Sequence, residues 1–300
     1  MSHSDNKKPV LIPLPALCDN EEEKIPQKFS KVCDGHVHLF PDLYFEAIWL
    51  WFDRFGWPVR YKLFSENLLE FLFSHGVEHI IGLSYAHKPG LASDLNNYMA
   101  ALQKKHKNLT GLATLFPGEE GVEDIFKEAS DLGLKGIKLH CHVQGFEVCG
   151  SPMIKIYEEC CRYNWPIIMH IGREPKSEAY KCDPYELCRV ENTEWVLKRF
   201  RNLKVCIPHL GSDEYVPYLK LAKTYDNLWL DTTMMLADYF PGQKIPEISE
   251  YRPDRLIYGS DFPNLPYAWD RELKKISTLP LSEQALERLL VINCKEFYGF

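Results

Sequence analysis

The chain has 300 residues, which suits one large α/β domain or two small ones, and its 45% hydrophobic and 26% charged residues are typical of a soluble globular protein. Its formal net charge of −7 argues against nucleic acid or an anionic membrane as a main partner. The sequence contains no apolar run close to the roughly 20 residues that a membrane-spanning helix needs.

Residues 1–30 contain several prolines and an acidic run at 21–23, which predicts a poorly structured arm or one that lies on the surface. The short apolar stretch at 10–17 is interrupted by prolines and lacks the small-residue cleavage site of an export signal. Without such a signal, the ten cysteines indicate reduced thiols in a cytoplasmic protein. They form no CxxC pair, which argues against a thiolate zinc site.

From residue 31 onward, short β-rich runs alternate with helical patterns, which is typical of βαβ units and a parallel sheet. The predicted strands cover 31–38, 77–84, 109–116, 134–140, 166–171, 204–209, 227–233 and 255–261. The predicted helices include 92–106, 121–131, 151–163, 192–201 and 213–225. Eight strand–helix units over 31–300 fit an α/β (β/α)₈ TIM barrel better than an open doubly wound sheet. A nucleotide-binding fold is further disfavoured because no GxGxxG or P-loop pattern follows a predicted strand.

Polar residues gather at the carboxyl ends of these strands, where the active site of a TIM barrel lies. They are His36, His38, Lys138, His140, His170, His209, Asp231 and Asp261. A barrel without catalytic function has no reason to place His and Asp repeatedly at one rim.

His36 and His38 are separated by one residue at the end of the first strand, so both project from the same face. Two adjacent imidazoles can hold a divalent metal ion and leave room for further ligands. Taken alone, the pair is equally well explained as two hydrogen-bonded histidines at a strand end. The further His and Asp residues at the other strand ends favour the metal.

Five segments resemble the amidohydrolase superfamily: 34–38 (DGHVH), 136–140 (GIKLH), 169–175 (MHIGREP), 208–211 (PHLG) and 258–263 (YGSDFP). The similarity is greatest to the amidohydrolase-related branch, which includes aminocarboxymuconate-semialdehyde decarboxylase and lactonases. The resemblance implies a distorted TIM barrel with a divalent metal ion, usually zinc. It implies that His36, His38, His170 and Asp261 bind the metal, and that His209 reaches the metal-bound water or the substrate.

The chemistry of these residues agrees with the resemblance. Three imidazoles and a carboxylate suit Zn²⁺, which lowers the pKa of a bound water to about 7. Asp261 is the expected general base, and His209 is expected to orient the water or to donate a proton. His140 either assists in the same way or only supports the site by hydrogen bonding.

Lys138 leaves the number of metal ions open. In binuclear members of the superfamily, a lysine at this strand end is carboxylated and bridges two ions, and here His170 and His209 would then bind the second. The GIKLH segment resembles the mononuclear branch more closely. We therefore expect one ion, most simply Zn²⁺, and an unmodified lysine that faces the pocket.

Features that would contact a substrate are less specific. Arg173 could bind a substrate carboxylate, or it could pair with Glu174 or another acid. Together with Lys138 and His140 it forms the predicted substrate-binding set. The long segment 173–190 after the fifth strand is expected to shape the pocket. The aromatic segment 40–61 indicates a helix that packs on the barrel or, alternatively, a lid over the pocket.

These observations favour a metal-dependent hydrolase of a small amide, lactone or ester. The alternative is a metal-dependent non-oxidative decarboxylase, because the same site can stabilise negative charge while CO₂ leaves. A barrel that only binds a ligand is a third possibility, which the complete ligand set argues against. The expected partner is a small-molecule substrate, and a homo-oligomer is compatible with the sequence.

Overall fold

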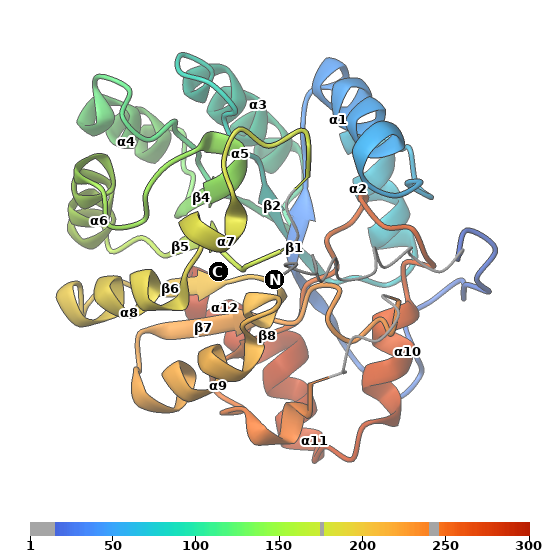
Figure 1. Cartoon of the computed structure of the whole chain (residues 1–300). Helices are drawn as coiled ribbons and strands as arrows, with labels where there is room; N and C mark the ends of the chain where they lie inside the picture. Colours follow the sequence, from blue (N-terminus) through green and yellow to red (C-terminus); the bar gives the residue numbers. More distant parts are fainter. Residues whose placement is uncertain (1–15, 175–176, 240–245) are drawn as a thin grey trace, which may run out of the picture.

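The computed structural model describes residues 16–174, 177–239 and 246–300. Parallel strands form the centre of the molecule and helices surround them, as the view along the barrel shows (Figure 1). The strands of the described chain are β1 (Cys33–His38), β2 (His79–Leu83), β3 (Leu109–Gly111), β4 (Ile137–His140), β5 (Ile167–His170), β6 (Val205–Ile207), β7 (Leu228–Asp231) and β8 (Leu256–Ile257). The predicted α/β TIM barrel is confirmed.

The α-helices of the described chain are α1 (Asp42–Phe55), α2 (Ser65–Ser74), α3 (Ala92–Lys105), α4 (Val122–Asp131), α5 (Cys141–Gln144), α6 (Ser151–Tyr163), α7 (Pro184–Leu187), α8 (Val190–Arg199), α9 (Tyr215–Thr224), α10 (Arg271–Thr278), α11 (Glu283–Glu287) and α12 (Asn293–Tyr298). The described chain also contains two 3₁₀ helices, η1 (His209–Gly211) and η2 (Ile248–Glu250), and one π-helix, η3 (Arg288–Ile292). Within the described ranges, no helix is both long enough and apolar enough to span a bilayer.

Two hydrogen-bonded sheets, β1-β2-β3 and β4-β5-β6-β7-β8, meet at two seams that close the barrel. At the first seam, the backbone N–H groups of Ala113 and Lys138 donate to Gly136 O and Ala113 O, each at 2.9 Å. At the second, the N–H groups of Gly35 and His38 donate to Tyr258 O at 2.9 Å and to Phe262 O at 2.8 Å. The second seam therefore brings the two histidines of β1 next to the segment that carries Asp261.

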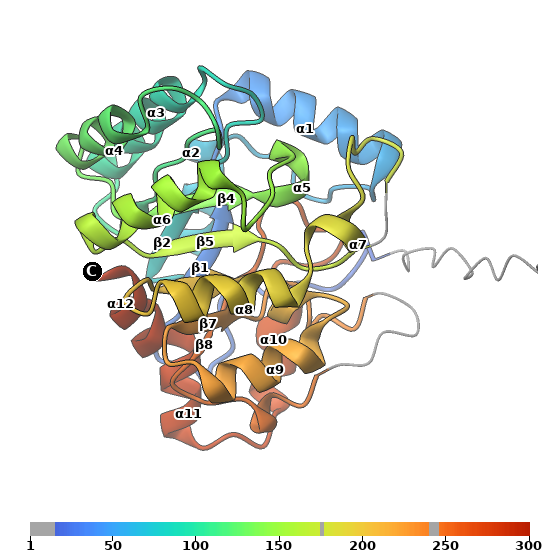
Figure 2. The ribbon, with the colours of Figure 1, turned by 60° about the vertical axis from the view of Figure 1, so that its left-hand side comes forward.

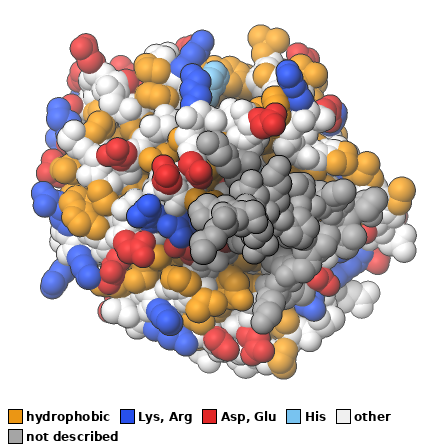
Figure 3. Space-filling model, in the orientation of Figure 1, with side chains coloured by type: hydrophobic (Ala, Val, Ile, Leu, Met, Phe, Trp, Pro, Cys, Tyr) orange, Lys and Arg blue, Asp and Glu red, His pale blue; other side chains and the backbone are white. Residues whose placement is uncertain are grey.

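The barrel has different structures at its two ends. Figure 2 shows α5 and α7 at the end toward which β5 points, while α3, α4, α6 and α8 lie along the outside. Because parallel strands all point the same way, the side chains that end β1, β4, β5 and β7 meet at the end with α5 and α7. On the face drawn in Figure 3, acidic and basic side chains are interspersed among the described residues.

The aromatic segment 40–61 forms α1, and two of its rings pack inward. Phe45 and Trp49 are buried and stack with their ring centroids 5.5 Å apart. This confirms the predicted packing helix for these two residues. Trp51 lies on another side of α1, where its ring stacks on Tyr180 of the segment after β5 at 5.7 Å.

Residues 16–30 contain neither helix nor strand and are held by scattered contacts. Ile25 N–H donates to His75 O at 2.9 Å, and Asp19 pairs with Arg271 at 2.7 Å. The first half of the predicted arm, residues 1–15, lies outside the described residues. A boundary between an arm and a barrel domain near residue 31 stays a prediction.

Candidate metal centre

His36, His38 and Asp261 form a buried group at the carboxyl end of the barrel. Asp261 Oδ1 lies 3.1 Å from His38 Nε2 and 3.4 Å from His36 Nε2. Ligand atoms of one tetrahedral zinc ion, with bonds of about 2.0–2.1 Å, lie about 3.3 Å apart. The spacing of these donors therefore suits a single ion bound by two imidazoles and one carboxylate.

The carboxylate of Asp231, at the end of β7, orients the imidazole of His36. Asp231 Oδ2 accepts the Nδ1–H of His36 at 2.8 Å, which directs the lone pair of His36 Nε2 toward Asp261. Asp231 Oδ1 accepts the backbone N–H of His209 at 3.0 Å. A carboxylate behind a ligating histidine is a common support of metal sites. The sequence placed Asp231 at this rim but indicated no role for it.

His209 lies beside this group with one ring nitrogen available. Its Nδ1–H donates to Thr233 O at 3.0 Å, which leaves the lone pair on Nε2. This buried Nε2 atom has no hydrogen-bond partner among the described residues. The ring centroid lies 5.8 Å from that of His36 and 4.6 Å from that of His170. Such an unpartnered nitrogen fits a group that binds a ligand, a substrate or a proton.

Two residues of the centre have left-handed backbone conformations, which are rare for residues other than glycine. These are Asp261, with φ 71°, and His209, with φ 54°. Asp34 supports the turn before Asp261, because its Oδ1 accepts the N–H groups of His36 at 3.1 Å and of Ser260 at 3.0 Å. Strained backbone of this kind clusters at functional sites and persists where the surrounding structure enforces it.

Burial sets the protonation states of the centre. It lowers the pKa of His36, of His38 and of His170, in the last case to about 3. Burial alone would raise the pKa of Asp261, but the hydrogen bond and charge of His38 and the other histidines lower it. Neutral imidazoles and an ionised carboxylate are the forms that bind a metal ion.

Lys138 reaches the centre from β4. Its Nζ lies 3.3 Å from His36 Nε2. Burial lowers the pKa of the ammonium to about 8. The side chain thus lies beside the metal-binding group, as the sequence led us to expect, and its role toward a substrate stays a prediction.

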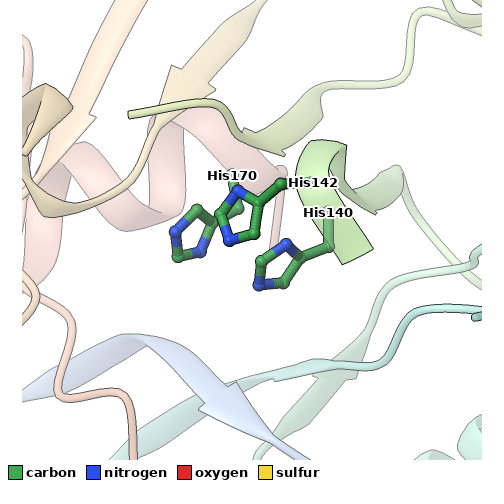
Figure 4. A group of neighbouring side chains, drawn as sticks. All are labelled: His140, His142 and His170. Atoms are coloured by element: carbon green, nitrogen blue, oxygen red, sulfur yellow. The ribbon is translucent and has the colours of Figure 1, made fainter. Parts of the chain in front are cut away.

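His140 and His170 belong to a second group of imidazoles, together with His142 (Figure 4). The rings of His140 and His170 stack with centroids 4.1 Å apart. Glu174 joins them, with Oε1 2.8 Å from His142 Nε2 and Oε2 3.5 Å from His170 Nε2. His170 was expected to share an ion with His36 and His38. The structure places it in the second group, and its assignment to the first ion stays a prediction.

His142 and Glu174 were not among the site residues predicted from the sequence. A signal was present, because His140 and His142 repeat the His-x-His spacing of the first strand. Glu174 follows His170 by four residues, but only the folded chain shows that its carboxylate turns back toward β5.

Arg173 lies at the edge of the site and pairs with an acid. Its Nη1 is 3.4 Å from Glu214 Oε1, and its guanidinium lies 5.6 Å from the centre of the Tyr185 ring. The pairing with Glu174 that the sequence allowed is not made, because the carboxylate of Glu174 lies against His142 and His170. Residues 175–176 of the long segment lie outside the described residues.

The whole barrel matches one family model. The model described as amidohydrolase matches residues 33–300. The chain belongs to the amidohydrolase family.

Solved structures of this fold include decarboxylases. The 5-carboxyvanillate decarboxylase of Novosphingobium aromaticivorans, solved with manganese and 4-hydroxy-3-methoxy-5-nitrobenzoic acid, is 15% identical, with a TM-score of 0.66 over 94% of this chain and 99% of that chain. The 2,6-dihydroxybenzoate decarboxylase of Rhizobium is 13% identical, with a TM-score of 0.65 over 90% of this chain and 99% of that one.

An uncharacterised TIM-barrel protein of Bordetella bronchiseptica is 19% identical, with a TM-score of 0.66 over 89% of this chain and 98% of that chain. No curated protein matches the sequence. At these identities the likeness establishes a shared fold.

Proposed function

We propose that this amidohydrolase-family enzyme is a metal-dependent non-oxidative decarboxylase of a small aromatic or unsaturated carboxylic acid. The observation that carries the proposal is the buried group of His36, His38 and Asp261, with the Lys138 side chain 3.3 Å from one of its imidazoles. A metal ion and a lysine side by side suit a substrate that is an anion. Two of the structural relatives are decarboxylases of hydroxylated benzoates, which supports this reaction over hydrolysis.

Aromatic rings beside the histidines favour a flat substrate. The ring of Tyr85 lies 4.8 Å from that of His140 and 5.8 Å from that of His38. Phe40 stacks nearly parallel to His38 at 6.1 Å. An apolar wall with a few polar groups next to it is typical of sites for small organic ligands.

We propose one divalent ion, Zn²⁺, bound by His36, His38, His170 and Asp261, as expected from the sequence. The donor set fits, because histidine-rich sites with a carboxylate suit zinc, and the second nitrogen of His36 is already held by Asp231. When bound, the ion would supply a Lewis acid that stabilises negative charge on the substrate.

The chain's own residues would bind the acid and handle one proton. Arg173, Lys138 and His140 form the proposed binding set for the substrate. When the bond to the carboxylate carbon breaks, its electron pair stays on the substrate carbon, CO₂ leaves, and the carbon takes up a proton. Asp261 would deliver this proton after accepting it from water, and His209 Nε2, which has no partner among the described residues, would hydrogen-bond the reacting groups.

Hydrolysis of a small amide, lactone or ester is the second candidate. The observation in its favour is the ionised carboxylate of Asp261 next to His209 Nε2, which together could position and deprotonate a water molecule. The two reactions use the same residues and differ in the bond that breaks.

The test measures both reactions on the metal-loaded full chain. One panel contains hydroxybenzoates and muconate-type acids, assayed for CO₂ and, in D₂O, for deuterium at the carbon that lost the carboxylate. The other contains lactones, esters and amides, assayed for acid release. We expect CO₂ from at least one acid and none from Asp261→Asn. Hydrolysis of the second panel without CO₂ from the first would replace decarboxylation by the second candidate.

A further inference from the structure

A single peptide group, the one that joins Thr233 to Met234, makes hydrogen bonds at both of its ends. Its carbonyl oxygen, Thr233 O, accepts the Nδ1–H of His209 at 3.0 Å. Its N–H, on Met234, donates to Glu272 Oε2 at 2.9 Å. The carboxylate of Glu272 and the imidazole of His209 are therefore linked through one peptide unit.

This peptide unit transmits orientation because it is planar and rigid. In a trans peptide the C=O and N–H bonds point in opposite directions, so a contact that fixes the N–H also fixes the direction of the carbonyl. A carboxylate that accepts the N–H also polarises the carbonyl and makes it a stronger acceptor. Glu272 thereby acts on both the direction and the strength of the acceptor that His209 meets.

The backbone at Met234 shows what the contact with Glu272 prevents. Met234 has a φ of 62°, a left-handed conformation that is rare for a residue with a side chain. Turning the 233–234 peptide over would bring this φ into the favoured negative range and would point the carbonyl away from His209. The contact with Glu272 opposes that rotation, because the N–H of the turned peptide would no longer face the carboxylate.

Asp231 also holds this turn, but at a different peptide group. Its Oδ1 accepts the N–H of Thr233 at 3.2 Å. That N–H is separated from the carbonyl of Thr233 by two rotatable backbone bonds, so it leaves the direction of the carbonyl open. Glu272 supplies the restraint that Asp231 does not.

Glu272 lies in the first turn of α10 and is built into the loop that follows β7. Its other oxygen, Oε1, accepts the N–H of Leu236 at 3.0 Å. The neighbouring Arg271 holds the same loop by its carbonyls, donating to Ala237 O and, at 3.0 Å, to Asp238 O. Glu272 is 2% exposed, and the two backbone N–H groups that it accepts offset the cost of burying a carboxyl group.

We propose that Glu272 is a positioning residue for His209, which it holds through the 233–234 peptide in the tautomer with the proton on Nδ1 and the lone pair on Nε2. The partner of one ring nitrogen decides which form the other nitrogen presents. Nε2 is the buried atom that has no partner among the described residues, so this tautomer presents an acceptor to the site. The arrangement is similar to a carboxylate that orients a catalytic histidine, with a peptide group between the acid and the ring. The use of His209 in turnover rests on the proposed function, whereas its positioning does not.

The tautomer of His209 can be measured by NMR. The full chain is loaded with Zn²⁺ and labelled with ¹⁵N-histidine, and two-bond ¹H–¹⁵N spectra report which ring nitrogen carries the proton. The spectrum of His209→Gln assigns the signals, because it lacks those of this ring. Glu272→Met removes both acceptors, and Glu272→Gln leaves one acceptor oxygen for two N–H groups.

Asp270→Asn is the matched control. Asp270 lies two residues before Glu272 and is as deeply buried. Its carboxylate accepts the N–H of Glu22 at 3.0 Å and pairs with Lys274 at 2.9 Å. Among the described residues its side chain makes no hydrogen bond to the loop after β7, so the variant disturbs α10 without touching the 233–234 peptide.

We expect a single pattern with the proton on Nδ1 of His209 in the wild type and in Asp270→Asn. Glu272→Met should show a mixture of the two tautomers, and Glu272→Gln a smaller shift in the same direction. Wild-type signals of His209 in a folded Glu272→Met would overturn the proposal, and Glu272→Gln decides in the same way if Glu272→Met unfolds. Equal changes in Asp270→Asn would also overturn it, because a general loosening of α10 would then account for them.

Turnover gives a second readout on the same variants. On the best substrate of the panel, Glu272→Gln should lower kcat about tenfold while KM and the bound Zn²⁺ stay at wild-type values, because a misplaced group affects the chemical step. Changed tautomers in the variants of a chain that releases no CO₂ would refute the proposed function and leave the positioning role standing. Release of CO₂ by the wild type, with unchanged His209 signals in both Glu272 variants, would refute the positioning role and leave the proposed function standing.

Discussion

Asp231 Oδ2 lies 2.8 Å from His36 Nδ1, and the other oxygen of the same carboxylate accepts the backbone N–H of His209 at 3.0 Å. One carboxylate therefore sets the orientation of an imidazole that we propose to bind the metal, and the position of a second histidine.

Asp231→Ala should weaken metal binding at the proposed site that contains His36. Without the carboxylate, the tautomer and orientation of His36 are no longer fixed, and the loss of such a supporting group typically lowers metal affinity about 10–100-fold. Competition with a coloured chelator measures the change. Asp226→Ala, an exposed aspartate just before the start of β7, should keep the wild-type affinity. An unchanged affinity in Asp231→Ala would show that Asp231 does not support a ligand.

Asp261→Asn should lower turnover by about 100-fold or more, because a positioned general acid or base contributes roughly 10²–10⁴-fold. The backbone N–H of residue 261 donates to His36 O at 3.0 Å and does not depend on the carboxylate, so the fold should persist. Initial rates on the best substrate of the panel, with circular dichroism as the control for folding, test this. Turnover near that of the wild type would remove Asp261 from the mechanism.

Arg173→Gln should raise KM about tenfold or more and change kcat less, if the guanidinium binds the substrate carboxylate. Glu214 Oε1 now lies 3.4 Å from Arg173 Nη1 and would compete with that carboxylate. Glu214→Gln should therefore lower KM or leave it unchanged. A wild-type KM in Arg173→Gln would place this side chain outside the binding site.

Gly211→Ala should destabilise the turn that carries His209. Gly211 has φ 88°, and a Cβ there would lie 1.9 Å from Tyr218 Cδ2. Left-handed strain and overpacking together predict a loss of about 2–5 kcal/mol of unfolding free energy. Gly299→Ala has a similar φ of 73° but nothing within 4 Å, so about 1–2 kcal/mol is expected there. Urea unfolding of both variants measures the difference, and equal losses would exclude the clash with Tyr218.

His79→Gln should flatten the acid side of the stability profile. Burial, with a smaller contribution from Lys295 and opposed by Glu78, lowers the pKa of His79 to about 4 from an ordinary 6.5. Between these values the unfolded chain binds a proton that the folded chain does not. The wild type therefore loses stability as the pH falls from about 6.5 to about 4.

The variant lacks this titration, and urea unfolding at several pH values compares the two slopes. The His79 ring stacks on Phe300 at 3.7 Å and its Nε2 lies 2.9 Å from Thr110 Oγ1, so its protonation is coupled to folding at the end of the barrel away from the metal centre. Parallel stability profiles of the wild type and the variant would contradict the assignment of this pH dependence to His79.

The local pattern of apolar and polar residues in the sequence was enough to predict the barrel fold. Alternating apolar strands and amphipathic helices place the strands within a few residues of their positions, because each element buries its own apolar side chains. The strand ends were predicted too long. The strand expected at 255–261 forms a ladder only over Leu256–Ile257, because the backbone N–H of Tyr258 then donates to Leu289 O, outside the sheet.

Part of the site could also be predicted from the sequence. His36 and His38 share a strand face at a fixed spacing, and Asp261 follows the last strand, so parallel strand order alone brings them to one rim. The topology therefore predicts that these three side chains lie close together, and in the structure they do.

The remaining contacts depend on the tertiary structure. Glu174, in the segment after β5, reaches His142 of α5. Asp231 of β7 reaches His36 of β1 past the intervening β8, and Arg173 meets Glu214 instead of Glu174. These pairs arise from side-chain directions and loop paths that no periodicity encodes. Sequence by itself determined which kinds of side chain stand at the rim, and only the packing of the loops decided which of them touch.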